Sequence, residues 1–200
     1  MPSTEFWASF QRVGQDLFRY DTRIYLHKVA RTSPSDVCIG AVVGKNPGSA
    51  KASNLSNPGI QPIFLDGDKM LPTVRNIVLK AYAEANIAGS AGEYIQVLNL
   101  FYLCEPNLTQ AIKSISKHSG TAFCQPEANS FPWVWYVWGD ENKSLSNFKT
   151  RFSSLNAPDH FYFDKDTEAV IGKVPSHNSF AKHTQGLKQG SVITHISGLI

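Results

Sequence analysis

Apolar and polar residues alternate along the chain in patterns that predict strands and helices in turn. The clearest strand lies within residues 36–49, DVCIGAVVGKNPGS, where small and β-branched residues run without interruption up to a polar loop. A run of this kind, bounded by Ser-Pro before it and Asn-Pro-Gly after it, is typical of a central strand buried on both faces. Further strands are expected at residues 20–29, 94–99, 133–138 and 160–163, the first of them at a sheet edge.

Apolar residues spaced three and four apart predict helices before and between these strands. The first is expected over residues 5–18, where it would cover a face of the sheet with Trp7, Phe10, Val13, Leu17 and Phe18. Others are expected over residues 72–85, 108–116 and 145–155. Strands that alternate with helices favour a parallel sheet between two helical layers. We therefore predict a three-layer α/β/α sandwich with a mostly parallel central sheet of about four to five strands.

The length of 200 residues and a hydrophobic content of 42% are enough for one sizeable core. We predict a single α/β domain over residues 1–200. Three parts have separate roles in this prediction: an N-terminal covering helix in residues 1–19, a long polar loop at the active face in residues 49–68, and a basic C-terminal segment in residues 171–200. Loops as long as the second are usually functional or disordered when they belong to compact domains.

The charge of the chain permits an anionic partner without requiring one. The formal net charge is +3, and only 18% of the residues are charged. Three cysteines, Cys38, Cys104 and Cys124, form an odd set without a C-x-x-C pair, which favours a reducing compartment. Neither a signal peptide nor a run long enough to cross a bilayer is visible. We expect a cytoplasmic protein without a membrane partner, and the sequence leaves its oligomeric state open.

Polar segments follow four of the predicted strands. They are the loop at residues 44–48, Asn99, the pair Gly139-Asp140, and the turn at residues 174–178. Because parallel strands end at the same edge of a sheet, these segments are expected to lie together, at the edge where α/β sheets bind ligands.

In this order the motifs resemble those of the uracil-DNA glycosylase superfamily, and the branch specific for uracil or thymine opposite guanine is nearest in spelling. The matching motifs are Gly44-Lys45-Asn46-Pro47-Gly48, Leu98-Asn99, Trp138-Gly139 and Val174-Pro175-Ser176. The resemblance implies a glycosylase-like fold and hydrolysis of an N-glycosidic bond in DNA. It requires that Asn46, Asn99 and Ser176 line one pocket.

The same resemblance implies roles for individual residues. Asn46 would be the catalytic residue and would orient the attacking water, because an amide is too weak a base to remove a proton. Asn99 would read a pyrimidine edge with its donor and its acceptor, and Ser176 would contact a phosphate. Backbone N–H groups around Gly48 would hold a phosphate or the departing base. The other predicted base- or nucleotide-binding residues are Gly44, Lys45, Pro47, Phe64 and His177.

A second resemblance, over residues 20–185, is to the domain of unknown function 1643 family of bacterial and phage proteins, which has no settled activity. Its shared features include the Asn-Pro-Gly strand exit, Asn99-Leu100-Phe101, and a helix start with Thr73 and Arg75. We interpret Thr73 and Arg75 as phosphate contacts at the positive end of a helix. The alternative is an exposed helix start.

Structural alternatives exist for the main motifs. Asn46-Pro47-Gly48 and residues 174–178 could be plain turns, and Asn99 could cap a strand. Neither Asp66, Asp68 and Asp140 nor the histidines have metal-ligand spacing, so no metal and no other cofactor is predicted. The functional prediction is a DNA- or nucleotide-binding protein that hydrolyses an N-glycosidic bond. The alternatives are a non-catalytic nucleotide- or nucleic-acid-binding module and a flavodoxin-like small-molecule binder.

Overall fold

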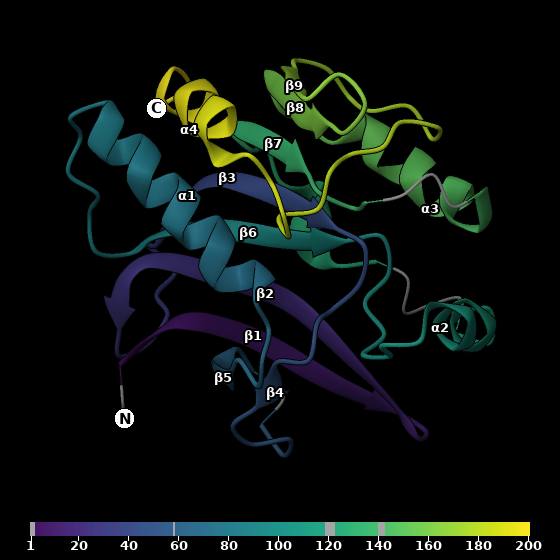
Figure 1. Cartoon of the computed structure of the whole chain (residues 1–200). Coiled ribbons are helices and arrows are strands. Elements are labelled where there is room, and N and C mark those ends of the chain that lie inside the picture. The colour runs from purple at the N-terminus through teal and green to yellow at the C-terminus, as the bar shows by residue number, and fades with distance from the viewer. Residues whose placement is uncertain (1–2, 58, 119–122, 140–142) are drawn as a thin grey trace.

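The fold is a large mixed sheet with helices on both faces. The computed structural model describes residues 3–57, 59–118, 123–139 and 143–200. Within these ranges, nine strands form one sheet in the order β4-β5-β1-β2-β6-β3-β7-β8-β9 (Figure 1). The prediction of a three-layer α/β/α sandwich with a mostly parallel sheet of four to five strands is therefore wrong. The prediction missed the strands β1, β4, β5 and β9, which extend the sheet on both sides.

The parallel part of the sheet agrees with the buried apolar runs in the sequence. The strands β6 (Glu93–Asn99), β3 (Val37–Gly44), β7 (Trp133–Tyr136) and β8 (Asp159–Asp164) lie side by side, and each neighbouring pair is parallel. The short strand β9 (Ala169–Ile171) pairs with β8 in the antiparallel direction. All four parallel strands were predicted, and their carboxyl ends define one edge of the sheet.

The N-terminal part differs most from the prediction. Residues 5–18 do not form a helix, because β1 (Thr4–Val13) and β2 (Asp16–Val29) make an antiparallel hairpin. Its turn passes through Gly14, whose φ of +61° is in the left-handed region that suits a two-residue hairpin turn. Residues on both faces of β1 are buried, so their apolar spacing imitated that of a helix. The strand β2 lies inside the sheet, between β1 and β6, and not at an edge.

The segment predicted as a long loop contains two more strands. The strands β4 (Lys51–Ala52) and β5 (Gln61–Phe64) pair with each other, and β5 also pairs with β1. The sheet therefore continues beyond the hairpin, with β4 as its last strand.

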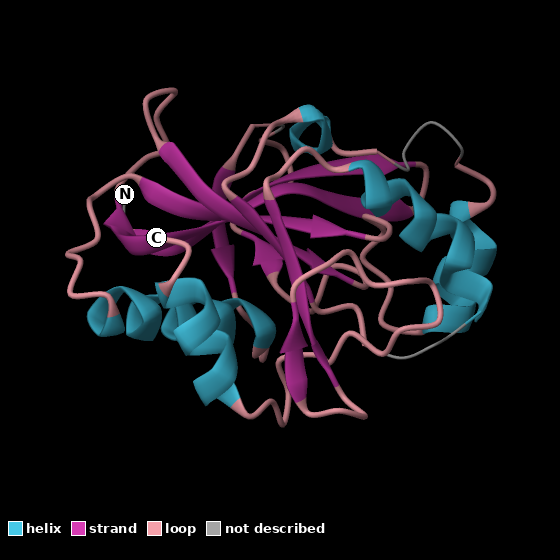
Figure 2. Ribbon diagram, turned by 90° about the horizontal axis from the view of Figure 1, so that it is seen from above, coloured by secondary structure: helices cyan, strands magenta, loops and turns pink. Residues whose placement is uncertain are grey.

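Helices cover both faces of the sheet (Figures 1 and 2). On one face, α1 (Met70–Glu84) and α4 (Gln189–Ser197) share a core cluster with apolar residues of β1, β2 and β6. On the other, α2 (Leu108–Ile115) and α3 (Ser146–Arg151) contribute to a second cluster. Short 3-10 helices are η2 (Gln125–Ala128), η3 (Lys143–Leu145) and η4 (Phe152–Ser154). The face with α1 and α4 also carries the cavity described below.

Candidate functional site

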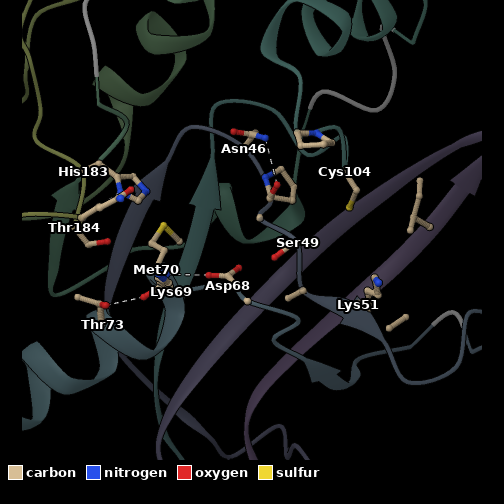
Figure 3. Close-up of a pocket in the computed structure, with 18 of the residues that line it drawn as sticks. Asn46, Ser49, Lys51, Asp68, Lys69, Met70, Thr73, Cys104, His183 and Thr184 are labelled. Carbon is tan, nitrogen blue, oxygen red and sulfur yellow. Dashed lines mark hydrogen bonds between the residues drawn. The ribbon is translucent and has the colours of Figure 1, made fainter.

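A cavity of about 1190 Å³ lies on the α1 face, next to the carboxyl ends of β3 and β6. Its walls come from the segment after β3 (46–52), the start of α1 (67–70 and 73), the segment after β6 (104 and 106) and the loop before α4 (183–187). Figure 3 shows His183 and Thr184 on one side of the pocket, Lys51 and Cys104 on the other, and Asp68 and Met70 between them. The pocket is large enough for a ligand of nucleotide size.

Asn46, the predicted catalytic residue, lines this pocket together with Pro47 and Gly48. Its side-chain nitrogen donates to the carbonyl oxygens of Pro47, at 3.3 Å, and of Glu105, at 3.1 Å. The bond to Glu105 connects the loop after β3 to the segment after β6, and the bond to Pro47 lies within the loop. Because the amide nitrogen is bound to the backbone, the amide oxygen is the atom with which Asn46 can accept a hydrogen bond from a ligand or a water.

Asp68 lies two residues before the first residue of α1 and also forms part of the pocket wall. Its Oδ1 accepts hydrogen bonds from the backbone N–H groups of Met70, at 2.9 Å, and Leu71, at 3.3 Å. A carboxylate at this position satisfies N–H groups that a helix start leaves without partners and complements the positive end of the helix. The helix therefore begins two residues before the predicted Pro72, and its first N–H groups already have an acceptor.

The two predicted phosphate contacts have other partners. Thr73 lines the pocket, and both its hydroxyl and its backbone N–H donate to the carbonyl of Lys69, at 2.6 and 3.2 Å. Arg75 does not line the pocket. Its guanidinium donates to the backbone carbonyls of Tyr25 and Leu26 at 2.7 to 3.2 Å. Arg75 thus fastens α1 to β2.

A buried arginine lies next to the Asp68 wall. The side chain of Arg19, on β2, has no exposed surface, and its Nη1 is 3.8 Å from Oδ2 of Asp68. Burial lowers the pKa of Arg19, while Cys104 and Asp68 raise it. None of its three guanidinium nitrogens has a hydrogen-bond partner among the described residues, and the same is true of Oδ2 of Asp68. A Cβ built on Gly48 would lie 2.4 Å from this oxygen, so only glycine allows the loop to approach Asp68 this closely.

His183 supplies an imidazole to the pocket. The backbone N–H of Gln185 donates to its Nδ1 at 3.2 Å, so the neutral ring carries its proton on Nε2 and can donate it to a ligand. Burial lowers the pKa of His183, as do Lys45 and Lys182, whereas Asp68 raises it. His183 was not among the predicted binding residues, whereas His177, in the same basic segment, was.

Asn99 is adjacent to the pocket without lining it. It ends β6, is fully buried, and neither atom of its amide has a hydrogen-bond partner among the described residues. A Cβ built on Gly44 would lie 3.0 Å from Oδ1 of Asn99 and 3.5 Å from the sulfur of Met70. Since Met70 lines the pocket, the amide of Asn99 lies close behind the pocket wall.

The remaining predicted residues do not line the pocket. Phe64 on β5 is 63% exposed and does not line the cavity. Ser176 bonds to Ser179 through its hydroxyl, at 2.9 Å, and the carbonyl of His177 accepts from Lys149 at 3.0 Å. The glycosylase interpretation required Asn46, Asn99 and Ser176 to line one pocket, and of these only Asn46 lines this one.

Gly44 and Lys45 are next to the pocket without lining it. Gly44 ends β3, and Lys45 is close enough to His183 to lower the pKa of His183. The structure therefore brings Asn46, Pro47, Gly48 and Thr73 together, with Gly44, Lys45 and Asn99 next to them. Asp68, Lys69, His183 and Thr184 join them in the lining, although none of them was predicted as a site residue.

The described ranges contain no group of three or more His, Cys, Asp or Glu side chains that could hold a metal ion. Asp140 lies outside these ranges. Among the residues that the structure describes, no helix is both long and apolar enough to cross a membrane. Cys38, Cys104 and Cys124 are free thiols.

No protein-family model matches the sequence, and no curated protein and no solved structure matches it. The two family resemblances therefore rest on short motifs alone.

Proposed function

We propose that the protein binds a nucleotide or a related nucleobase-containing ligand in the pocket at the carboxyl ends of β3 and β6. One observation carries this proposal: the cavity gathers Asn46, Lys51, Lys69 and His183 at the sheet edge where α/β proteins bind ligands. Amide and imidazole groups suit the polar edge of a base, and ammonium groups suit a phosphate.

The pocket also offers apolar surface for the flat face of a base. Its apolar lining residues come from four separate segments of the chain and include Leu17, Pro47, Ala50, Ala52, Leu55, Met70 and Leu187. A ligand with an apolar ring, a polar edge and a charged end matches this mixture better than a purely apolar or a purely ionic ligand does.

The buried amide of Asn99 provides further support. A buried amide without partners costs about 1–3 kcal/mol, and native proteins tend to retain such a group where it has a function. Met70 lines the cavity near this amide, and its flexible side chain adapts to irregular space. Rotation of Met70 would open the pocket to a donor and an acceptor that can pair with the edge of a base.

Hydrolysis of an N-glycosidic bond is a second candidate, favoured by the anchoring of Asn46. With its nitrogen fixed on two backbone carbonyls, its oxygen has a defined direction from which it can orient a water. Binding without product would support the non-catalytic alternative.

A thermal-shift panel tests the proposal. Nucleosides, nucleoside 5′-monophosphates and short single-stranded and double-stranded DNA would be added to the wild-type protein, and the melting temperature recorded for each. Nucleosides or nucleotides should raise the melting temperature in a concentration-dependent way. No shift and no calorimetric binding across the whole panel would overturn the proposal. An excision assay on uracil-containing and mismatched DNA then decides whether the binding protein also hydrolyses.

A further inference from the structure

The buried guanidinium of Arg19 has a positive charge without an adequate counter-ion. An arginine keeps its proton in proteins, so burial of Arg19 buries a full charge. Asp68 is at 3.8 Å, which is longer than a hydrogen bond, and Oδ1 of the same carboxylate is already used by the start of α1. All three guanidinium nitrogens therefore keep donors without an acceptor among the described residues. Such groups are costly unless water, an ion or a ligand satisfies them.

Arg19 lies directly beside the pocket. The two groups that act on its pKa, Cys104 and Asp68, both line the cavity. Leu17, two residues earlier on β2 and so on the same face of the strand, lines it as well. Arg19 itself does not line the cavity, so its side chain lies behind the wall to which these three residues contribute.

The charges around the cavity also favour an anion. The described lining residues with cationic side chains are Lys51 and Lys69, and Lys45 is close to His183. Lys51 is paired with Asp66 at 2.7 Å, and Asp68 is the acidic residue of the lining. With Arg19 behind the wall, positive groups outnumber negative ones, and a concave site of this kind concentrates anions.

We propose, as an extension of the nucleotide-binding function and dependent on it, that the ligand carries a phosphate monoester and that this phosphate becomes the hydrogen-bond partner of the Arg19 guanidinium. Because Arg19 is fully buried and does not itself line the cavity, the phosphate reaches it only when the side chains of Leu17, Asp68 and Cys104 move apart. A planar guanidinium binds two phosphate oxygens at once, so it discriminates strongly between a phosphorylated ligand and its parent nucleoside.

Isothermal titration calorimetry with three kinds of probe tests this inference: nucleosides, the corresponding nucleoside 5′-monophosphates, and inorganic phosphate. The wild-type protein should bind a monophosphate about ten-fold or more tightly than the same nucleoside, with inorganic phosphate competing. In Arg19→Met, which removes the charge and keeps an unbranched side chain, this difference should disappear. Arg23→Met is the control, because Arg23 is on the same strand, is paired with Asp21 at 3.0 Å and does not line the pocket.

The outcomes separate the two proposals. Equal affinities of the wild-type protein for nucleoside and monophosphate would overturn the phosphate inference and leave nucleotide-pocket binding standing. Binding of neither nucleosides nor monophosphates would overturn the proposed function itself. If Arg19→Met does not fold, the comparison of nucleoside with monophosphate on the wild-type protein still decides, as does Arg19→Lys, which keeps the charge but loses the bidentate geometry.

Discussion

The carboxylate of Asp68 joins two parts of the fold: one oxygen caps α1, and the other lies 3.8 Å from the guanidinium of Arg19 on β2. A single acidic side chain thus sets where the helix begins and supplies the nearest negative charge to a buried positive one. Because Asp68 also lines the cavity, substitutions of Asp68 are expected to change both stability and ligand binding.

Asp68→Ala removes the cap and leaves the charge of Arg19 without its nearest anion. We expect a loss of about 3–5 kcal/mol in the free energy of unfolding, as for other buried ion pairs that lose one partner. Urea denaturation measures it. Asp66→Ala is the control, because Asp66 forms an exposed pair with Lys51, for which about 1 kcal/mol or less is expected. Equal effects of the two substitutions would show that Asp68 does not compensate the charge of Arg19.

Gly48→Ala adds a methyl carbon that would lie only 2.4 Å from Oδ2 of Asp68. Asp68 is held by its helix-capping bonds, so we expect the loop to move, with a loss of about 1–3 kcal/mol and weaker ligand binding. Gly190→Ala in α4 is the control: a Cβ there meets no atom within 4 Å, and alanine is the better helix former. Wild-type stability and affinity in Gly48→Ala would contradict the described contact.

The lowered pKa of His183 makes stability depend on pH. Burial and Lys45 lower the pKa below its ordinary 6.5, Lys182 lowers it further, and Asp68 opposes them. The folded state therefore resists protonation. The contribution of His183 to stability is present in full above about pH 6.5 and is lost as the pH decreases below this value, because the unfolded chain takes up the proton first. We expect the free energy of unfolding of His183→Gln to change less between pH 7.5 and pH 5 than that of the wild type. Identical pH profiles would exclude the effect.

Arg75→Met tests whether this arginine binds phosphate or holds α1 on the sheet. Since its guanidinium donates to the carbonyls of Tyr25 and Leu26, we expect a loss of about 1.5–3 kcal/mol in stability. Ligand affinity, measured by calorimetry on the folded variant, should be unchanged. A large loss of affinity without loss of stability would instead support the phosphate contact predicted from the sequence.

Asn99→Leu replaces a buried amide without partners by an apolar group of similar size. Removing an unsatisfied polar group is neutral or stabilising, so we expect an equal or higher melting temperature. Nucleobase binding should weaken if Met70 gives access to this amide. Unchanged affinity would show that Asn99 takes no part in binding.

The sequence identified the elements whose local apolar pattern fits one kind of secondary structure. The strands β3, β6, β7 and β8 and the helix α1 follow from local runs and periodicity. The hairpin of β1 and β2 could not be separated from a helix in this way, because both faces of β1 are buried and only pairing with β5 and β6 decides its structure. Long-range pairing of this kind overrides local spacing.

The candidate site was predictable where a residue follows a strand, as Asn46 does, or lies near the start of a helix, as Thr73 does. Asn46 was found because it ends the run of β3. Arg19 and Asp68 meet across about fifty residues of chain, and His183 joins them from the C-terminal segment, so no local motif indicates their contact. An arginine within the apolar sequence Leu17-Phe18-Arg19-Tyr20 was the signal available for a buried charge.

Calorimetric titration of the wild-type protein, Asn46→Ala and Ser176→Ala with the nucleotide that shifts the melting temperature most is the most direct test of the central claim. Asn46 lines the cavity and Ser176 does not, although the sequence assigned both to the site. We expect Ser176→Ala to bind like the wild type and Asn46→Ala to lose about ten-fold or more in affinity. Equal affinity in all three proteins would contradict binding in this pocket.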